Sequence, residues 1–114
     1  MHVNSLKHFF DALTAARAIQ KFIANKTYED YLEDELLSAG VERKFEIIGE
    51  ALNRILKESP EDLKKVTNYR GIIDFRNVVA HAYDHLEDAL VWGLASNQLH
   101  KLIAELEAID GVDP

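Results

Sequence analysis

The stretch VERKFEIIGEALNRIL, residues 41–56, decides the fold, because its apolar side chains recur at spacings of four, three, four and three residues. This is the period of an α-helix with one buried face. The repeat consists of Val41, Phe45, Ile48, Leu52 and Ile55. A second apolar set, made of Ile47, Ala51 and Leu56, widens that face beyond what one neighbour needs. We therefore expect a long helix over 41–58 with several partners.

The same period predicts helices on the N-terminal side of this stretch. An amphipathic pattern indicates a first helix over about 3–25. Thr27 followed by Asp30 has the spacing of a capping box, which predicts a short helix over about 28–38. We expect Gly40 to mark a break or kink before the long helix, because glycine is unfavourable inside helices.

Helical signals continue on the C-terminal side. Ser59 and Pro60 resemble an N-cap and a first-position proline, so a short helix is expected there. The next long helix is predicted over about 69–83. Asp84 has the spacing of a second cap and opens a final helix, predicted as one piece over about 85–110. Leucines and one isoleucine should line that helix: Leu86, Leu90, Leu94, Leu102, Leu106 and Ile109.

Short connections between long helices favour an all-α fold, an antiparallel up-and-down four-helix bundle with an additional short helix. A length of 114 residues suits a single domain over 1–114. The chain has no cysteine, which excludes a disulfide framework, a thiolate zinc site and a cysteine nucleophile. It has neither a signal-peptide pattern nor an apolar run of roughly 20 residues, so we expect a soluble, cytoplasmic protein without membrane contact.

The charge is acidic overall but unevenly distributed. The net charge of −7 argues against general, charge-driven binding of nucleic acid. Residues 41–76 hold eight Lys/Arg and seven Asp/Glu, whereas residues 77–114 hold one Lys and seven Asp/Glu. A polyanion should therefore contact the middle of the chain, and a basic partner protein the C-terminal helix.

The segment RNVVAHAY, residues 76–83, combines four functional groups within about two helical turns. It holds the guanidinium of Arg76, the amide of Asn77, the imidazole of His81 and the phenol of Tyr83. At about 100° per residue, Asn77 and His81 share one helix face, and Arg76 and Tyr83 share a neighbouring stripe. The segment is therefore the candidate functional site.

These groups suit phosphodiester chemistry on RNA without a metal ion. An arginine fork can hold a phosphate by two hydrogen bonds and offset charge that grows in the transition state. A histidine titrates near neutrality and can remove or deliver a proton. An asparagine can orient the phosphate or the imidazole ring. A 2′-hydroxyl attacking the adjacent phosphate would leave a cyclic phosphate end.

The pattern Arg-Asn-x4-His-x-Tyr resembles the signature of the HEPN superfamily, and more narrowly that of the HepT-like toxins. Two flanking stretches strengthen the resemblance. The sequence FEIIGEA at 45–51 is similar to the EIIGEA of the family's preceding long helix, and Val91-Trp92 matches after the motif. The resemblance extends over about 3–110. One departure is that family members often read AGMRN where this chain reads IDFRN, so Asp74 lies two residues before the motif arginine.

The resemblance implies a homodimeric, metal-independent endoribonuclease that acts as the toxin of a HepT/MntA-type toxin–antitoxin pair. The two copies of the motif would face each other across the dimer and form one cleft. We consider the apolar face of the helix over 41–58 a candidate for part of that interface. The substrate would be RNA, with tRNA and mRNA both open, and no cofactor is implied.

Individual roles follow from the same resemblance. Arg76 and His81 would be catalytic, and Asn77 would support them. Tyr83 would be the residue to which a cognate minimal nucleotidyltransferase, the antitoxin, attaches AMP. That modification would place bulk and negative charge beside Arg76, where it would compete with the substrate phosphate.

Each motif residue also has a purely structural explanation: His81 could be a satisfied structural histidine, and Asn77 an ordinary exposed residue. Arg76 could pair with Glu46 or Glu50 of the preceding long helix, since a buried arginine needs such a partner. Tyr83 could pack on Trp92. Glu46 and Glu50 have the spacing of paired catalytic carboxylates, but a salt-bridged helix face explains them better.

Two further alternatives concern the site as a whole. His81 and His85 are four residues apart and could form half of a metal site, but a cap at Asp84 would break their shared face. The second alternative is a different class of protein, a non-catalytic HEPN module. Such a module would partner a minimal nucleotidyltransferase or bind a nucleotide through Arg76.

Overall fold

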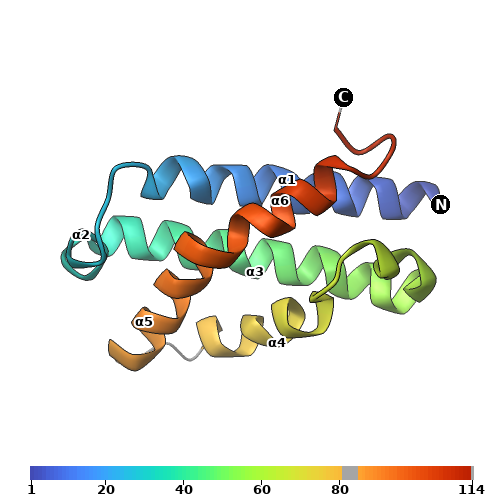
Figure 1. The fold of residues 1–114 in the computed structure, drawn as a ribbon. Coiled ribbons are helices and arrows are strands. Elements are labelled where there is room, and N and C mark those ends of the chain that lie inside the picture. Colours follow the sequence, from blue (N-terminus) through green and yellow to red (C-terminus); the bar gives the residue numbers. More distant parts are fainter. Residues whose placement is uncertain (81–84, 114) are drawn as a thin grey trace.

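The computed structural model describes the backbone of residues 1–80 and 85–113, and the side chains of residues 1–74 and 88–113. Across these residues the chain forms six α-helices, one 3₁₀ turn and one π turn, and no strand. The long elements run alternately in opposite directions (Figure 1). The prediction of an all-α, up-and-down bundle is therefore confirmed.

Two long antiparallel helices form the scaffold (Figure 1). The first, α1 (Val3–Ile23), packs along α3 (Glu35–Glu58). The predicted stripe of α3 is buried, with each side chain at most 3% exposed: Val41, Phe45, Ile48, Leu52 and Ile55. In α1, Ala12, Ala15 and Ala16 are equally buried, and side chains this small let helices approach closely.

The wide apolar face of α3 is largely buried against other helices of the same chain. Ala51 is buried, and Ile47 and Leu56 pack against the same core. This second apolar set is therefore mostly covered by the chain's own helices, which leaves less of it for the dimer interface suggested above.

The short helix α2 (Tyr28–Glu33) begins at the predicted capping box. The backbone N–H of Asp30 donates to Thr27 Oγ1 at 3.1 Å, and the backbone N–H of Thr27 donates to Asp30 Oδ2 at 2.9 Å. Both donors would otherwise lack a partner within the helix. The capping box predicted from spacing alone is therefore confirmed.

The break expected at Gly40 is wrong, because α3 is continuous from Glu35 onward. The chain turns instead at Asp34, whose carboxylate accepts a hydrogen bond from the backbone N–H of Leu37 at 3.0 Å. Gly40 serves packing: a Cβ there would lie 3.3 Å from Cε2 of Phe22 in α1. The glycine thus accommodates a neighbouring side chain and does not interrupt the helix.

The connection after α3 is a 3₁₀ helix, η1 (Pro60–Lys65). Ser59 precedes it, as expected, but its side chain makes no capping hydrogen bond. The backbone N–H of Asp62 donates to the carbonyl of Ser59 at 3.0 Å. That i→i+3 bond occupies the N–H that a serine cap would have used, so the side-chain cap predicted there is wrong.

The final helix predicted over about 85–110 is present from His85 to Glu107, but it contains a π turn that the sequence did not predict. It consists of α5 (His85–Gly93), the π turn η2 (Leu94–Gln98) and α6 (Leu99–Glu107). We call α5, η2 and α6 together the α5–α6 limb. Within this limb the hydroxyl of Ser96 donates to the carbonyl of Trp92 at 2.7 Å, and this bond competes with the backbone hydrogen bonds of a regular helix. The extra residue in the π turn shifts the register of the apolar stripe. Leu90 is 53% exposed, whereas Leu102, Leu106 and Ile109 are buried.

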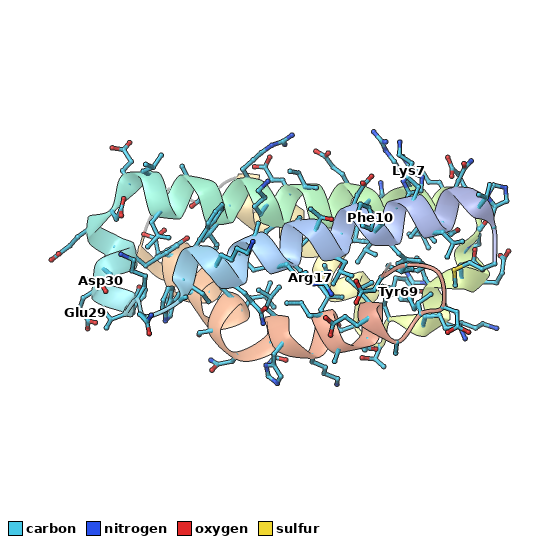
Figure 2. All side chains as sticks on the ribbon, turned by 90° about the horizontal axis from the view of Figure 1, so that it is seen from above. Lys7, Phe10, Arg17, Glu29, Asp30 and Tyr69 are labelled. Atoms are coloured by element: carbon cyan, nitrogen blue, oxygen red, sulfur yellow. The ribbon has the colours of Figure 1, made fainter. Side chains whose placement is uncertain are left out.

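An ion-pair network ties the end of this limb back to α1. Arg17 donates to Glu107 Oε2 at 2.7 Å and to Asp113 Oδ2 at 2.9 Å. Figure 2 shows Arg17 beside α6 and the C-terminal segment. Among the described residues, no helix is long and apolar enough to cross a membrane.

Candidate active site

The motif begins on α4 (Tyr69–Ala80), the helix expected over about 69–83. Arg76 and Asn77 lie in the second half of α4, and their side chains are outside those described. His81 and Tyr83 lie outside the described residues, as does the cap expected at Asp84. The structure thus places the helix on which the motif begins, and the convergence of the four groups stays a prediction.

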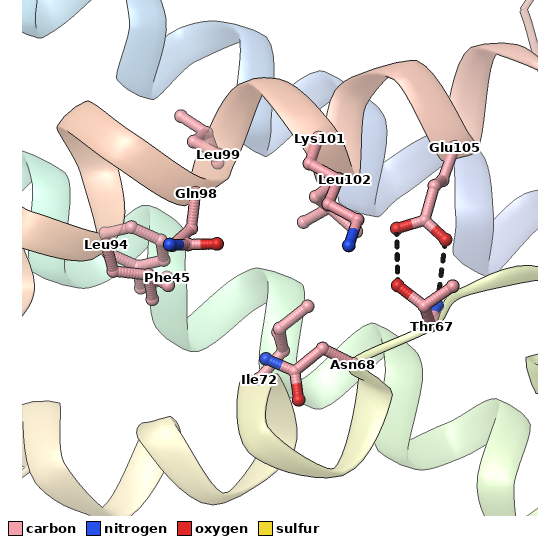
Figure 3. A pocket seen from close by; sticks show the side chains of 10 residues that line it. All are labelled: Phe45, Thr67, Asn68, Ile72, Leu94, Gln98, Leu99, Lys101, Leu102 and Glu105. Carbon is pink, nitrogen blue, oxygen red and sulfur yellow. Dashed lines mark hydrogen bonds between the residues drawn. The ribbon is translucent and has the colours of Figure 1, made fainter.

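The first half of α4 is anchored to the rest of the fold by two means. Ile72 and Ile73 are buried, at 9% and 7% exposed, and α4 packs along α3. Just before α4, the backbone N–H and the hydroxyl of Thr67 bond to the two oxygens of Glu105 in α6, at 2.8 and 3.1 Å (Figure 3). This carboxylate fixes the start of the motif helix against the last helix of the bundle.

Beyond the motif, α5 is fixed by aromatic packing. Val91 is fully buried, and the ring of Trp92 lies 5.5 Å from that of Tyr31 and 6.4 Å from that of Tyr28, centroid to centroid. Both tyrosines belong to α2. Within the described residues, Trp92 therefore packs on α2. The contact suggested between Trp92 and Tyr83 lies outside these residues.

Negative charge gathers beside the start of α5. Burial raises the pKa of the Glu42 carboxyl, and the neighbouring charges of Asp88 and Glu46 raise it further. Burial likewise raises the pKa of the Tyr31 phenol, with smaller contributions from Glu42 and Asp88. A phosphate approaching this side would meet repulsion, so cations of the motif would have to hold it.

The carboxylates of α3 have a local partner. Arg43 lies 3.3 Å from Glu46 and 3.9 Å from Glu50, measured from nitrogen to oxygen. The interpretation of Glu46 and Glu50 as a salt-bridged helix face is therefore confirmed. The pairing suggested between these carboxylates and Arg76 involves a side chain outside those described. Asp74, the departure noted before the motif, is exposed.

Metal binding finds no support in the described part of the chain. There, no three His, Asp or Glu side chains gather as they would around a metal ion. The pair suggested by sequence, His81 and His85, has no described side chain. The metal-free chemistry assigned to the motif stays a prediction.

A pocket that sequence reasoning missed lies beside the first turn of α4. It has a volume of about 220 Å³ and is bounded by α3, α4, η2 and α6 (Figure 3). Its lining comes from three separate segments of the chain: Phe45, Thr67, Asn68, Ile72, Leu94, Gln98, Leu99, Lys101, Leu102 and Glu105. No local pattern links these positions, so only the packing of the helices could show the pocket.

The chain is similar to known proteins over most of its length. A family model described as Ribonuclease HepT-like matches residues 12–109, which include all of α4 and the motif. "Putative RNase MJ1380" of Methanocaldococcus jannaschii is 25% identical over 100 residues, covering 88% of this chain and 91% of that protein. "Putative RNase TTE0752" of Caldanaerobacter subterraneus subsp. tengcongensis is 28% identical over 83 residues, covering 73% of each. No solved structure matches the chain at a comparable level of significance.

Proposed function

We propose that this chain, which belongs to the Ribonuclease HepT-like family, is a metal-independent endoribonuclease that acts as the toxin of a toxin–antitoxin pair. The observation that carries the proposal is the family match, because it spans the motif and the helices that hold it. The names of the relatives point to the same class of activity for those proteins. A ribonuclease-like function is thus supported at the level of the family, and activity of this chain is what we propose.

The proposed reaction uses Arg76 and His81. A histidine takes the proton of the ribose 2′-hydroxyl as the 2′-oxygen attacks the adjacent phosphorus. The bond from phosphorus to the 5′-oxygen breaks, and that oxygen leaves with a proton delivered by a second acid. The products are a 2′,3′-cyclic phosphate and a 5′-hydroxyl. Arg76 balances the charge that grows on the phosphoryl oxygens, with Asn77 orienting the phosphate or the ring.

A homodimer gives this reaction the groups it needs. One chain offers one Arg76 and one His81, whereas a two-fold axis brings a second copy of each to the same cleft. One histidine can then act as the base while its partner acts as the acid. The negative charge around Glu42 and Asp88 makes paired arginines more useful, because it would otherwise repel the RNA backbone.

The proposed regulation acts on Tyr83. A cognate minimal nucleotidyltransferase would transfer AMP from a nucleoside triphosphate to the phenolic oxygen, with release of pyrophosphate. The added phosphate would lie on a residue seven positions after Arg76 in the sequence and would compete for the same guanidinium. Binding of that antitoxin and modification by it would therefore both suppress cleavage.

The decisive experiment measures cleavage of tRNA and of total cellular RNA by the purified protein in EDTA. The mass of the protein is first measured to exclude AMP on Tyr83. Arg76→Ala and His81→Ala are expected to lower the rate at least about a hundredfold while leaving the thermal midpoint nearly unchanged. His100→Ala is the matched control, because His100 is exposed on α6 and outside the motif.

Two results would contradict the proposal. Full activity of His81→Ala would remove His81 from the mechanism. An absence of cleavage by the unmodified wild-type protein would favour a non-catalytic module that partners a nucleotidyltransferase.

A further inference from the structure

The pocket beside α4 has an apolar interior and a polar rim. Its buried lining side chains are all apolar, and they include Phe45, Ile72 and Leu102. The side chains of Asn68, Gln98 and Lys101, by contrast, are exposed at its edge. A cavity that is mostly apolar with a few convergent polar groups is the usual form of a small-molecule site.

The rim groups are available to a bound molecule. Thr67 and Glu105 satisfy each other, as described above. Within the described part of the chain, the side chains of Asn68, Gln98 and Lys101 make no hydrogen bond or ion pair. Figure 3 shows Gln98 and Lys101 pointing into the space between α4 and α6, whereas the Asn68 amide lies along the first turn of α4, beside Gly71.

The π turn shapes one side of this pocket. Leu94 and Gln98 are the first and last residues of η2, and both belong to the lining. A π turn is costly relative to a regular helix and often occurs at a functional site. Here it supplies an apolar wall through Leu94 and an amide through Gln98.

We propose that this pocket holds one unpaired base of the RNA substrate, next to the phosphodiester that is cleaved. This inference rests on the proposed function. The apolar walls would hold the base, the amide of Gln98 would bond to its edge, and Lys101 would pair with the adjoining phosphate. The volume of about 220 Å³ is below the usual 300 Å³ or more of drug-sized sites, which suits one base better than a whole nucleotide.

The position of the pocket fits this role. Ile72 lines it, and Arg76 follows Ile72 on α4 by one helical turn, about 6 Å along the axis. A base in the pocket would therefore belong to a nucleotide close to the phosphate held by the motif. A side-chain amide pairs by two hydrogen bonds with an edge of adenine, so adenine is the base expected to bind best.

The first test measures binding and needs no cleavage. AMP, CMP, GMP and UMP are titrated into the wild-type protein, and the methyl resonances of Ile72, Leu94 and Leu102 are followed by NMR. We expect saturable shifts that are largest for AMP and that are lost in Gln98→Ala. His100→Ala, an exposed neighbour outside the lining, should retain them. Absence of shifts, or equal shifts with ribose 5-phosphate, would overturn the proposal.

The second test maps cleavage sites in a pool of random single-stranded RNA. Gln98→Ala is expected to lower the preference for the favoured flanking base about tenfold, with total cleavage of the pool changed only a few-fold. An unchanged preference would overturn the proposal. The failures of the two proposals can be told apart. Nucleotide binding without cleavage would contradict the proposed nuclease activity. Cleavage without nucleotide binding would contradict the proposed role of the pocket.

Discussion

The α1–α3 pair and the α5–α6 limb are both built from apolar helical repeats, yet they pack in different ways. In α3 the stripe is continuous and its members are at most 3% exposed. In the α5–α6 limb the π turn interrupts the repeat, and Leu90 is left 53% exposed. The pocket lies where this limb faces α3 and α4.

The difference shows how one extra residue in a helix changes what the helix can do. A regular repeat keeps one apolar helix face toward its neighbour along its whole length. The side chains of the two helices can then reach the packing density of a protein interior. An extra residue in one turn rotates the side chains that follow it about the helix axis. The two halves of the limb therefore pack against different neighbouring helices. The α1–α3 pair therefore provides rigidity, while the α5–α6 limb provides a concave surface beside the motif helix.

The largest expected effect compares one leucine from each region. Leu52→Ala, at a fully buried position of α3, should lower the free energy of unfolding by about 2–5 kcal/mol. Leu94→Ala, at a partly exposed position of the pocket wall, should lower it by about 1 kcal/mol. Urea denaturation followed by circular dichroism measures both. Equal losses would mean that the limb is packed as tightly as the scaffold.

The continuity of α3 is tested at Gly40. Proline there would remove a helical hydrogen bond and clash with the preceding turn, so Gly40→Pro should destabilise the fold by about 3 kcal/mol. Gly40→Ala is the matched control. Its Cβ would approach Phe22, which is 38% exposed and can move outward, so a net change within about 1 kcal/mol is expected. Tolerance of proline in thermal melts would show that the helix breaks at this position after all.

A smaller effect is expected at the capping box that opens α2. Thr27→Ala removes the acceptor for the backbone N–H of Asp30 and should lower the free energy of unfolding by about 1 kcal/mol. Because α2 packs on Trp92, the chain's single tryptophan, fluorescence reports the same transition. Thr14→Ala, at an exposed position within α1, should have little effect. Equal losses for both threonines would argue against a special role of the cap.

The smallest effect concerns the link between the two regions and depends on pH. Hydrogen bonding to Arg17 lowers the pKa of the Asp113 carboxyl in the folded state. This carboxyl therefore adds stability above its unfolded pKa of about 4 and loses that contribution as the pH falls through its lower folded value. Arg17→Gln should lower the melting temperature slightly at pH 7, and the difference from wild type should shrink toward pH 2. A difference that stays constant with pH would exclude this pairing as its source.

Features that depend on neighbouring residues in the sequence could be predicted well. The stripe of α3 and the capping box at Thr27 and Asp30 are local, because helix period and cap spacing act within a few residues. The break at Gly40 was wrong because Phe22, distant in sequence, explains that glycine. The π turn in the final helix was not predicted, because the spacing of the leucines gave no sign of it.

The candidate site divides in the same way. Its proposed chemical groups could be named from the sequence, since Arg76, Asn77, His81 and Tyr83 form a recognisable pattern there. Their support could not, because Glu105 holds the start of α4 from more than thirty residues away. The pocket could not be predicted either, because its walls come from three segments that meet only when the helices pack.

The sequence by itself determined that this protein is a bundle of helices and where most of them begin, and it names the residues proposed to carry its chemistry. These properties follow from periodicity, capping and residue type, each of which acts over a few positions. Only the tertiary structure decided that α3 runs unbroken, that the last helix widens into a π turn, and that a pocket lies beside the motif helix. Those features depend on the volume and charge of side chains that come from distant parts of the chain. They are therefore determined only when these side chains pack against one another.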